Sequence, residues 1–359
     1  MNLSPLSMPL EVLTPAWATG ANQQQAEIRV SSIRGQLRFW LRMSNPDEGL
    51  DDALFGRADN SGARASCVAL HIKSWQGLAK VQNLEDYTGR TGDDALHDPE
   101  AYFLWPLRPT RESQQKRGVV WAATPTANAN FTVEFTWFPP ALPQRARLEP
   151  ALSRAAKAFS LLGTFGTRST RGYGSIWPAG MNLANAAALS HELDFLPVSV
   201  SVRLLPVVAS SGRGALAEAA KWFRKLRLGT DRFDETPSVW GRNDHDVALH
   251  PTERDELHRP ALGLPLAQNY KNGPRLQTKY RWRDPETGRE AWNDRYPSPV
   301  RFKVVRIGGS YRVVLVLLRS QLLPDGTRLR LEERGHPIGE TRLSHELFDF
   351  IAEQGETIH

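Results

Sequence analysis

The stretch GTFGTRSTRGYGSIWP, residues 163–178, joins a helix-like segment to a strand-like one and combines glycines, arginines and hydroxyl side chains. Glycine lets a backbone come close to a ligand, and Arg168 and Arg171 provide the paired donors that suit phosphate. Tyr173 is expected to offer a face to a base. The glycines are Gly163, Gly166, Gly172 and Gly174, and the hydroxyl residues are Thr164, Thr167, Ser169 and Thr170.

This combination favours a surface for a sugar–phosphate backbone that does not depend on base identity. The alternative is a turn whose glycines only connect two elements. Two nucleotide-binding motifs do not fit. A Walker A loop ends in Gly-Lys-Ser/Thr, and the stretch has no lysine. A dinucleotide fingerprint opens a helix after a strand, whereas here the helix comes first.

The elements around this loop predict a ferredoxin-like arrangement. Apolar periodicity indicates strand, helix, strand, strand, helix and strand, which is the split βαβ pattern. A strand, a helix, a hairpin and a helix then follow. The predicted fold is α+β, with two tandem ferredoxin-like (RRM-like) domains at 1–185 and 186–359. Two polar segments, 76–117 and 229–298, are interpreted as long irregular insertions.

The expected helices cover residues 31–43, 148–163, 213–227 and 343–355. The expected strands lie within 9–17, 53–75, 131–138 and 198–208, with a hairpin at 301–318. In the helix at 31–43, one apolar face is formed by Ile33, Leu37, Trp40 and Leu41. Arg34, Arg38 and Arg42 share a second face, and like charges at this spacing destabilise a helix. The arginine stripe is therefore expected to meet an anion or a carboxylate, with a solvated face as the alternative.

Composition limits the class of protein. The 359 residues include 45 Lys and Arg against 39 Asp and Glu, a net charge of +6, and this mild excess suits a polyanionic partner. The single cysteine, Cys67, excludes an internal disulfide or a cysteine-based zinc site and favours a cytoplasmic protein. No signal peptide is visible. The longest aliphatic run, VVLVLL at 313–318, fits a buried strand, so no membrane partner is expected.

Several segments resemble one family. GTFGTRSTRGYGSIW is similar to the glycine-rich loop of the RAMP superfamily of CRISPR-associated RNA-binding proteins. VSSIRGQLRFWLR (30–42) is similar to the first-helix motif of that superfamily, and LFGRADNSGARASCVAL (54–70) resembles the segment that follows it. LGLPLAQN (262–269) and RYPSPVRFKVV (295–305) resemble segments in one branch, the first RAMP subunit of type III-B (Cmr) effectors.

The resemblance implies two ferredoxin-like RAMP domains in a subunit at the crRNA 3′ end of an effector filament, where it helps to capture target RNA in antiviral defence. Its partners would be crRNA, target single-stranded RNA and other RAMP subunits of the Cmr effector. The helix motif carries over onto Ser31, Ser32, Arg34, Gly35 and Arg38, and the loop motif onto Gly163, Gly166, Arg168, Arg171, Gly172 and Gly174. Arg42 joins these RNA-binding candidates from the arginine stripe.

The sequence favours RNA binding without cleavage. Filament subunits of this superfamily carry a cleaving aspartate in the loop before the first-helix motif. Here that loop, residues 20–30, holds no aspartate, and Glu27 is its only acid. The densest histidine group, His245 and His250 in NDHDVALH, is expected in a polar loop, at a spacing that suits neither a metal nor catalysis. No catalytic residue, metal ligand or cofactor is predicted. A RAMP endoribonuclease and a basic scaffold that contacts only proteins are the alternatives.

Aromatic residues near basic ones are further candidates for base stacking, with packing in a core as the alternative. In the first half these are Trp17, Trp40, Trp105, Trp121 and Trp137, of which Trp40 falls on the apolar helix face and is expected in the core. In the second half Trp240, Trp282 and Trp292 lie in basic stretches, and KYRWRDPETGR (279–289) is the second candidate for an RNA contact.

Overall fold

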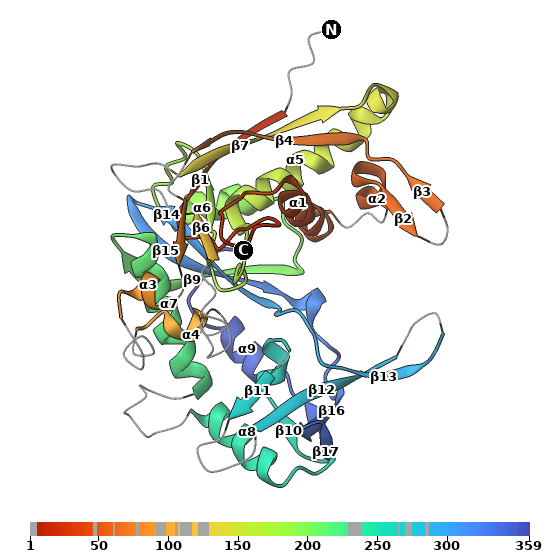
Figure 1. Cartoon of the computed structure of the whole chain (residues 1–359), viewed down its shortest axis with the longest axis vertical. Helices are drawn as coiled ribbons and strands as arrows, with labels where there is room; N and C mark the ends of the chain where they lie inside the picture. Colours follow the sequence, from red (N-terminus) through yellow and green to blue (C-terminus); the bar gives the residue numbers. More distant parts are fainter. Residues whose placement is uncertain are drawn as a thin grey trace. The chain divides into compact units, whose positions relative to one another are not determined.

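Two compact units make up the chain in the computed structural model (Figure 1). Unit 1 comprises residues 1–220, 302–316 and 356–359, and unit 2 comprises residues 221–301 and 317–355. The structure describes residues 6–45, 49–59, 62–76, 79–82, 84–90, 98–104, 107, 117–120, 129–228, 238–264, 266–269, 275–283 and 287–359.

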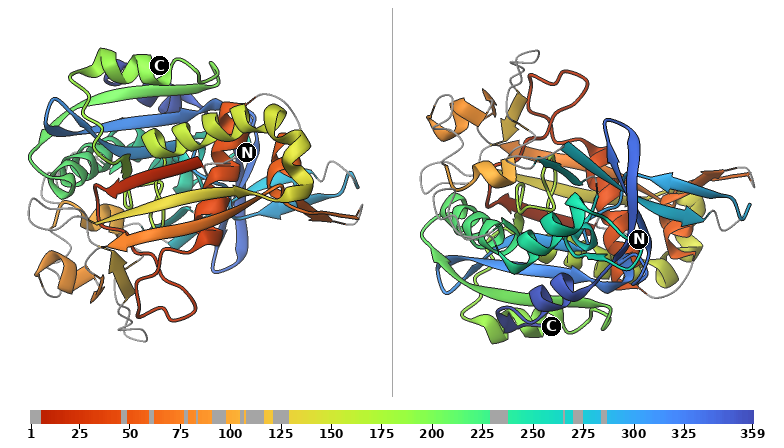
Figure 2. Two further views of the ribbon diagram at one scale, coloured as in Figure 1. Left: turned by 90° about the horizontal axis from the view of Figure 1, so that it is seen from above. Right: turned by 90° about the horizontal axis from the view of Figure 1, so that it is seen from below.

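Unit 1 begins with an antiparallel four-stranded sheet in the order β4-β7-β1-β8. Along the chain its elements are β1 (Leu6–Val12), α1 (Val30–Ser44), β4 (Val68–Gln76), β7 (Asn130–Trp137), α5 (Arg145–Leu162) and β8 (Ile176–Pro178). Figure 2 (left) shows β4, β7 and β1 side by side in orange, yellow and dark red. Each helix connects two strands that are not neighbours, so the predicted ferredoxin-like topology is confirmed.

Apolar residues that repeat every two positions form these strands, and those that repeat every 3.6 positions form these helices, as expected. In β7 the side chains of Phe131, Val133 and Phe135 alternate with more exposed residues and are buried. In α1 the residues Ile33, Leu37, Trp40 and Leu41 are buried. Helices α1 and α5 pack against each other, and burial of their apolar faces supplies the main stabilisation of this part of the core.

The same topology recurs in the second half of the chain. Its elements are β9 (Val200–Ala209), α7 (Gly212–Leu228), β14 (Val300–Ile307), β15 (Ser310–Leu318), α9 (Glu346–Ala352) and β18 (Glu356–Thr357), and the strand order is β14-β15-β9-β18. The β14–β15 turn is Gly308-Gly309, where both residues have positive φ, as a two-residue hairpin turn requires. A short helix, α6 (Ala186–Leu193), precedes this repeat.

Most of unit 2 comes from two segments that interrupt the second repeat, one between α7 and β14 and the other between β15 and α9. They form the sheet β10-β17-β16-β12-β11, with β13 also paired to β12. The elements are α8 (Val239–Leu249), β10 (Glu256–Leu257), η4 (Arg259–Leu262), β11 (Leu266–Asn269), β12 (Arg275–Arg283), β13 (Glu290–Asn293), η5 (Arg319–Gln321), β16 (Arg328–Glu333) and β17 (His336–Leu343).

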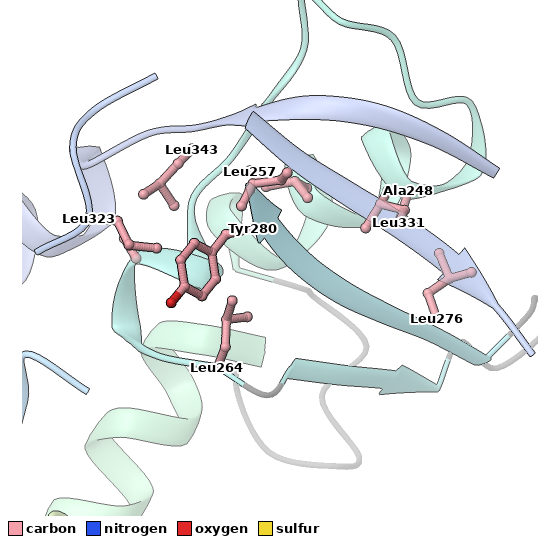
Figure 3. Packing of buried hydrophobic residues seen from close by; sticks show 10 residues of the cluster. Ala248, Leu257, Leu264, Leu276, Tyr280, Leu323, Leu331 and Leu343 are labelled. Carbon is pink, nitrogen blue, oxygen red and sulfur yellow. The ribbon is translucent and has the colours of Figure 1, made fainter. Parts of the chain in front are cut away.

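Unit 2 has a hydrophobic core of its own, which includes Leu257, Leu276, Tyr280, Leu331 and Leu343 (Figure 3). The expectation of an irregular insertion at 229–298 is therefore wrong for its described residues, because alternate side chains of β12 meet those of β16 and β17 in this core. The predicted boundary between residues 185 and 186 falls inside unit 1. The division into domains 1–185 and 186–359 stays a prediction.

The segment between α1 and β7 also contains regular elements. A helix, α2 (Leu50–Phe55), leads into the hairpin β2 (Arg57–Asp59) and β3 (Gly62–Arg64). The expected irregular insertion at 76–117 instead holds β5 (Ala79–Gln82), α3 (Leu84–Thr88), α4 (Ala101–Leu104) and the start of β6 (Arg117–Val120). A 3₁₀ helix, η3 (Pro139–Gln144), precedes α5. Among the described residues, no helix is both long and apolar enough to cross a membrane.

Residues 243–249 of NDHDVALH are helical, which corrects the expectation of a polar loop for His245, whereas His250 is exposed just after the helix. Asp244 of α8 is fully buried. Its carboxylate accepts hydrogen bonds from the backbone N–H groups of His258 and Arg259, at 2.9 and 3.1 Å, and from Nε of Arg259 at 2.7 Å. Asp244 therefore anchors η4 to α8 inside unit 2, a structural role that the sequence pattern did not indicate.

Replacing Asp244 by alanine is expected to destabilise unit 2 by about 3–5 kcal/mol, because Arg259 is left buried without its partner. The matched control is Asp246→Ala on the exposed side of the same helix, where a change of about 0.5 kcal/mol or less is expected. Urea unfolding followed by tryptophan fluorescence measures both. Equal stabilities of the two variants would contradict the anchoring role.

Candidate nucleic-acid interface

The glycine-rich loop between α5 and β8 is closed by its own backbone. The N–H of Gly172 donates to the carbonyl oxygen of Ser169 at 3.1 Å, and the N–H of Gly174 donates to that of Pro15 at 2.9 Å. The N–H of Phe165 donates to the carbonyl of Gly174 at 3.0 Å. The N–H groups of Gly172 and Gly174 are therefore engaged inside the protein, contrary to the expectation that they face a ligand.

Two buried hydroxyl groups fasten the loop to its neighbours. Thr14 Oγ1 donates to the carbonyl of Gly172 at 2.7 Å and accepts from the N–H of Ser175 at 2.8 Å. Ser175 Oγ donates to the same carbonyl at 2.8 Å and accepts from the N–H of Val304 in β14 at 3.0 Å. Because each hydroxyl both donates and accepts a hydrogen bond, the base of the loop is held in a defined conformation.

Gly174 shows why glycine is required at this position. Its φ is +65°, a value that L-residues other than glycine rarely adopt. A Cβ at Gly174 would also collide with the carbonyl oxygen of Phe165. Gly174 thus serves a tight turn and the close approach of Phe165, as the interpretation of the glycines as turn residues expects.

A buried carboxylate lies beneath the loop. Glu100, which directly precedes α4, accepts hydrogen bonds from the hydroxyl groups of Tyr173 at 2.6 Å and Tyr87 at 2.8 Å. Its other oxygen accepts from Nε of Arg213 in α7 at 2.7 Å. The side chain of Tyr173 has no exposed surface, so the expectation that this ring stacks on a base is wrong. Tyr173 instead ties the loop to Glu100.

Burial shapes the acid–base properties of this network. It raises the pKa of the Glu100 carboxyl above its ordinary value, while the hydrogen bonds from Tyr173 and Arg213 act in the opposite direction. The pKa values of Tyr87 and Tyr173 lie well above those of exposed tyrosines, first through burial and then through the nearby Glu100 charge. Both tyrosines therefore remain hydrogen-bond donors at neutral pH.

A lysine supports the loop from the side of β14. Lys303 is fully buried, and its ammonium donates to the carbonyl of Gly163 at 2.6 Å and to the carbonyl of Ile176. Burial lowers the pKa of Lys303 well below its usual range. Its two acceptors lie at the beginning of the loop and at the start of β8, so Lys303 joins the two ends of the loop. The sequence did not single out Lys303 or Glu100.

The outward part of the loop is residues 166–171. Gly166 is exposed, and the five residues after it are half-buried. Arg168 has a positive φ of 64°, and its Nε donates to the carbonyl of Phe103 in α4 at 2.6 Å. The guanidinium of Arg171 lies 6.0 Å from the ring centre of Phe302. Both arginines are thus held by other elements while part of each remains accessible to an anion.

The other candidate face belongs to α1. Ser31, Ser32 and Gly35 are exposed near the start of this helix. A Cβ built at Gly35 has no atom within 4 Å. Glycine inside a helix costs about 0.5–1 kcal/mol relative to alanine, and nothing within the described protein requires its small size here. The helix backbone is therefore accessible at Gly35.

Two arginines of the α1 stripe contact a carboxylate. The sequence analysis gave such a contact and a solvated face as its two expectations. Nε of Arg38 lies 2.8 Å from Asp51 of α2, and Arg42 lies 2.5 Å from the same carboxylate. Arg34 donates to the carbonyl of Phe55. The guanidinium groups are therefore partly neutralised and fixed in position, and exposed pairs of this kind contribute little to stability.

Two arginines that the sequence analysis did not select extend this basic surface. Arg57 and Arg64 lie directly opposite each other in the β2–β3 hairpin. Together with Arg34 and Arg38 they line a hollow of about 380 Å³. Like charges directly opposite in a sheet are unfavourable, and Asp52 lies 3.5 Å from Arg57. A hollow lined by four arginines suits an anion. The only sequence signal was the spacing of arginines in the segment 54–70.

The tryptophan candidates of the first half are core residues where the structure describes them. Trp17, Trp40 and Trp137 are buried, so Trp40 is in the core as expected and the other two are not available for base stacking. Trp17 packs edge-on against Tyr87 and Tyr173, with ring centres 4.9 and 5.3 Å apart. Trp105 and Trp121 lie outside the described residues.

Comparison with known families identifies the N-terminal part of the chain. Residues 9–177 match the model of the RAMP superfamily. The match contains both α1 and the glycine-rich loop, so the two candidate faces lie within the matched segment. Comparison with curated proteins gave no match.

The similar solved structures include three that cover most of the chain. Cmr1 from Pyrococcus furiosus in its apo form has 14% identity and a TM-score of 0.49, and 89% of each chain is covered. A chain of the type III-B Cmr-beta complex bound to cognate target RNA and AMPPnP has 13% identity and a TM-score of 0.43, covering 89% of this chain and 96% of that one. A chain of Cmr-beta bound to cognate target RNA has 11% identity and a TM-score of 0.46, with coverage of 88% and 94%.

The Glu100 network predicts a pH-dependent stability difference between the unaltered protein and Glu100→Gln. The carboxyl titrates near 4.5 in the unfolded chain and at a higher pH in the folded one. Between these values the unfolded chain holds fewer protons, so the stability of the unaltered protein falls as the pH rises. Glutamine does not titrate, and the stability of the unaltered protein relative to the variant should therefore fall over this range.

Melting temperatures of both proteins at a series of pH values measure this difference. Glu149→Gln is the control, because Arg145 holds the pKa of the Glu149 carboxyl below its ordinary value. The stability of the unaltered protein relative to Glu149→Gln should therefore rise with pH below the ordinary pKa of glutamate. If the unaltered protein instead gained stability over Glu100→Gln with rising pH, the ion pair with Arg213 would outweigh the burial of the carboxylate.

Proposed function

We propose that the chain is a non-cleaving RNA-binding subunit of a CRISPR type III-B (Cmr) effector. It acts in the cytoplasm, at the crRNA 3′ end of the filament, and helps to capture target RNA. The observation that carries the proposal is a RAMP domain with two faces built for a polyanion. One face has an open glycine beside two exposed serines on α1, and the other has two arginines held at the outer part of the glycine-rich loop.

The two faces suit the sugar–phosphate backbone of single-stranded RNA. Gly35 allows the backbone of a ligand to approach the helix, where Ser31 and Ser32 offer hydroxyl donors. Arg168 and Arg171 offer guanidinium groups that form paired hydrogen bonds with phosphate. None of these groups requires a particular base, so sequence preference should be weak. The arginine hollow of α1 and the β2–β3 hairpin adds positive charge to the same domain.

The Cmr assignment rests on the residues outside the RAMP match. The segments 262–269 and 295–305 resemble those of the first RAMP subunit of Cmr effectors. In this proposal crRNA, target RNA and neighbouring RAMP subunits are the partners. Binding without cleavage rests on the loop before α1, whose single acid, Glu27, has its carboxylate against the backbone of Gly20. RNA shortened by the purified protein would favour a RAMP endoribonuclease instead.

Replacing Arg168 and Arg171 by alanine is expected to weaken the binding of single-stranded RNA and to flatten its salt dependence. Each phosphate contact that is lost should reduce the slope of log K against log salt by about 0.7. Fluorescence anisotropy with a labelled oligouridine at two or more salt concentrations measures this change. Arg242→Ala, at an exposed arginine of α8, is the control and should leave the slope unchanged. An unchanged slope in the double variant would remove the loop from the interface.

Gly35→Ala is expected to change the stability of the protein and its affinity for RNA in opposite directions. Alanine is expected to stabilise the free protein by about 0.5–1 kcal/mol, since it favours the helix and its methyl group meets no atom within 4 Å. The same methyl group should hinder the approach of RNA and weaken its binding. Chemical unfolding and anisotropy on one preparation measure both effects. A variant that is more stable and binds RNA as well as the unaltered protein would show that this helix face does not contact RNA.

A further inference from the structure

We propose that the ribbon formed by residues 280–283 of β12 and 290–293 of β13 is a second binding site for single-stranded RNA. The ribbon belongs to unit 2 and lies outside the RAMP match. The proposal adds a site to the proposed function and rests on that function for the choice of RNA as ligand. It is carried by the pairing of the strands, by one partly exposed indole and by three exposed arginines that form no ion pair within the described part of the chain.

The ribbon is the two-stranded extension of a larger sheet. Strand β12 pairs with β16 from Leu276 to Tyr280, and with β13 from Tyr280 to Arg283. Beyond Tyr280 its described pairing is with β13, and Figure 1 shows β13 at the end of this extension. Two-stranded ribbons without a core are marginally stable in water, so the extension contributes little to the fold of unit 2.

A row of core residues continues onto the ribbon. Leu276, Thr278 and Tyr280 share one face of β12 and are buried, and Figure 3 shows Leu276 and Tyr280 in the core. Trp282 is the next residue in this row, but it is 40% exposed. Its partner across the ribbon is Ala291, whose side chain is too small to cover an indole. The ring is therefore accessible to a base, and base–aromatic stacking is a common contact to single strands.

Several basic residues lie close to this indole in the sequence of the ribbon. Arg281 is paired with Glu290 and Lys279 with Glu332. Arg283, Arg289 and Arg295 are exposed, and none of them forms an ion pair within the described part of the chain. Each of these three can therefore meet a phosphate without giving up an ion pair with any of the described residues.

The other tryptophan of the ribbon, Trp292, has a guanidinium group on its ring. The guanidinium of Arg330 lies 4.0 Å from the ring centre of Trp292 and also contacts Glu340 at 3.0 Å. Trp292 thus has a cation from within the protein on its ring, whereas Trp282 is 40% exposed. An acidic peptide would satisfy the arginines but would leave the indole unused. Single-stranded RNA supplies both a base for stacking and phosphates for the arginines, while a duplex keeps its bases stacked inside.

The test compares variants of the full-length chain for binding of labelled oligouridine by anisotropy. Trp282→Ala should weaken binding about fivefold or more, the range expected for one stacked base, and Trp282→Phe should retain most of the affinity. Arg283→Ala with Arg289→Ala should reduce the salt slope by about 0.7 for each phosphate contact. Arg242→Ala is the control for an exposed arginine of unit 2. Thermal unfolding of each variant verifies that it is folded.

The outcomes separate this site from the RAMP domain. Unchanged affinity in Trp282→Ala would overturn the ribbon site, while weaker binding by the loop variant Arg168→Ala with Arg171→Ala would leave the proposed function intact. An equal loss in Trp282→Ala for duplex RNA would show that the ribbon does not stack bases and would also overturn the proposal. If polyglutamate bound to the ribbon while RNA affinity stayed unchanged in all ribbon variants, the site would be assigned to an acidic protein. Failure of the unaltered chain to bind any RNA would contradict the proposed function as well.

Discussion

Burial of the Glu100 carboxylate is the constraint on which the candidate interface depends. A buried carboxylate is unfavourable unless donors surround it, and here three donors do so: two tyrosine hydroxyls and one guanidinium. They come from α3, from the glycine-rich loop and from α7. One side chain therefore connects the segment between β4 and β7 with the loop and with the second ferredoxin-like repeat. The positions of Arg168 and Arg171 follow from this connection, because it fixes the loop that carries them.

The glycine-rich loop has a buried base and a partly exposed outer part. Its base is closed by backbone hydrogen bonds, by the hydroxyls of Thr14 and Ser175 and by the ammonium of Lys303. Its outer part, residues 166–171, presents partly exposed side chains. A rigid base reduces the conformational freedom that an RNA ligand would otherwise have to restrict on binding. The buried charges of Glu100 and Lys303 thus hold the base of the loop beneath its partly exposed residues.

Local patterns predicted the ferredoxin-like elements well. The alternation in β7, the 3.6-residue period in α1 and the Gly308-Gly309 turn each place their residues as expected, because these signals act over a few neighbouring residues. The sheet of unit 2 was missed. Its strands come from two segments of the sequence, one before β14 and one after β15. In β12, polar residues alternate with the buried ones, so the sequence does not show the buried row clearly. Only tertiary pairing reveals that row.

Only part of the candidate site was predicted, because only some of its residues belong to local sequence patterns. Glycine and arginine spacing located the loop and the α1 face, since those signals are local. Glu100 and Lys303 were missed because each is a single charged residue in an unremarkable context, and its importance appears only when its distant partners surround it. Tyr173 was assigned to the surface because an aromatic residue between two glycines resembles an exposed platform. Its hydroxyl instead points to Glu100.

Hydrogen exchange of the full-length protein, with and without single-stranded RNA, tests the central claim most directly. The account predicts that RNA slows amide exchange in residues 166–171 and at the start of α1, while the base of the loop is already protected in the free protein. Protection confined to other segments, with exchange in the loop and in α1 unchanged by bound RNA, would contradict the account.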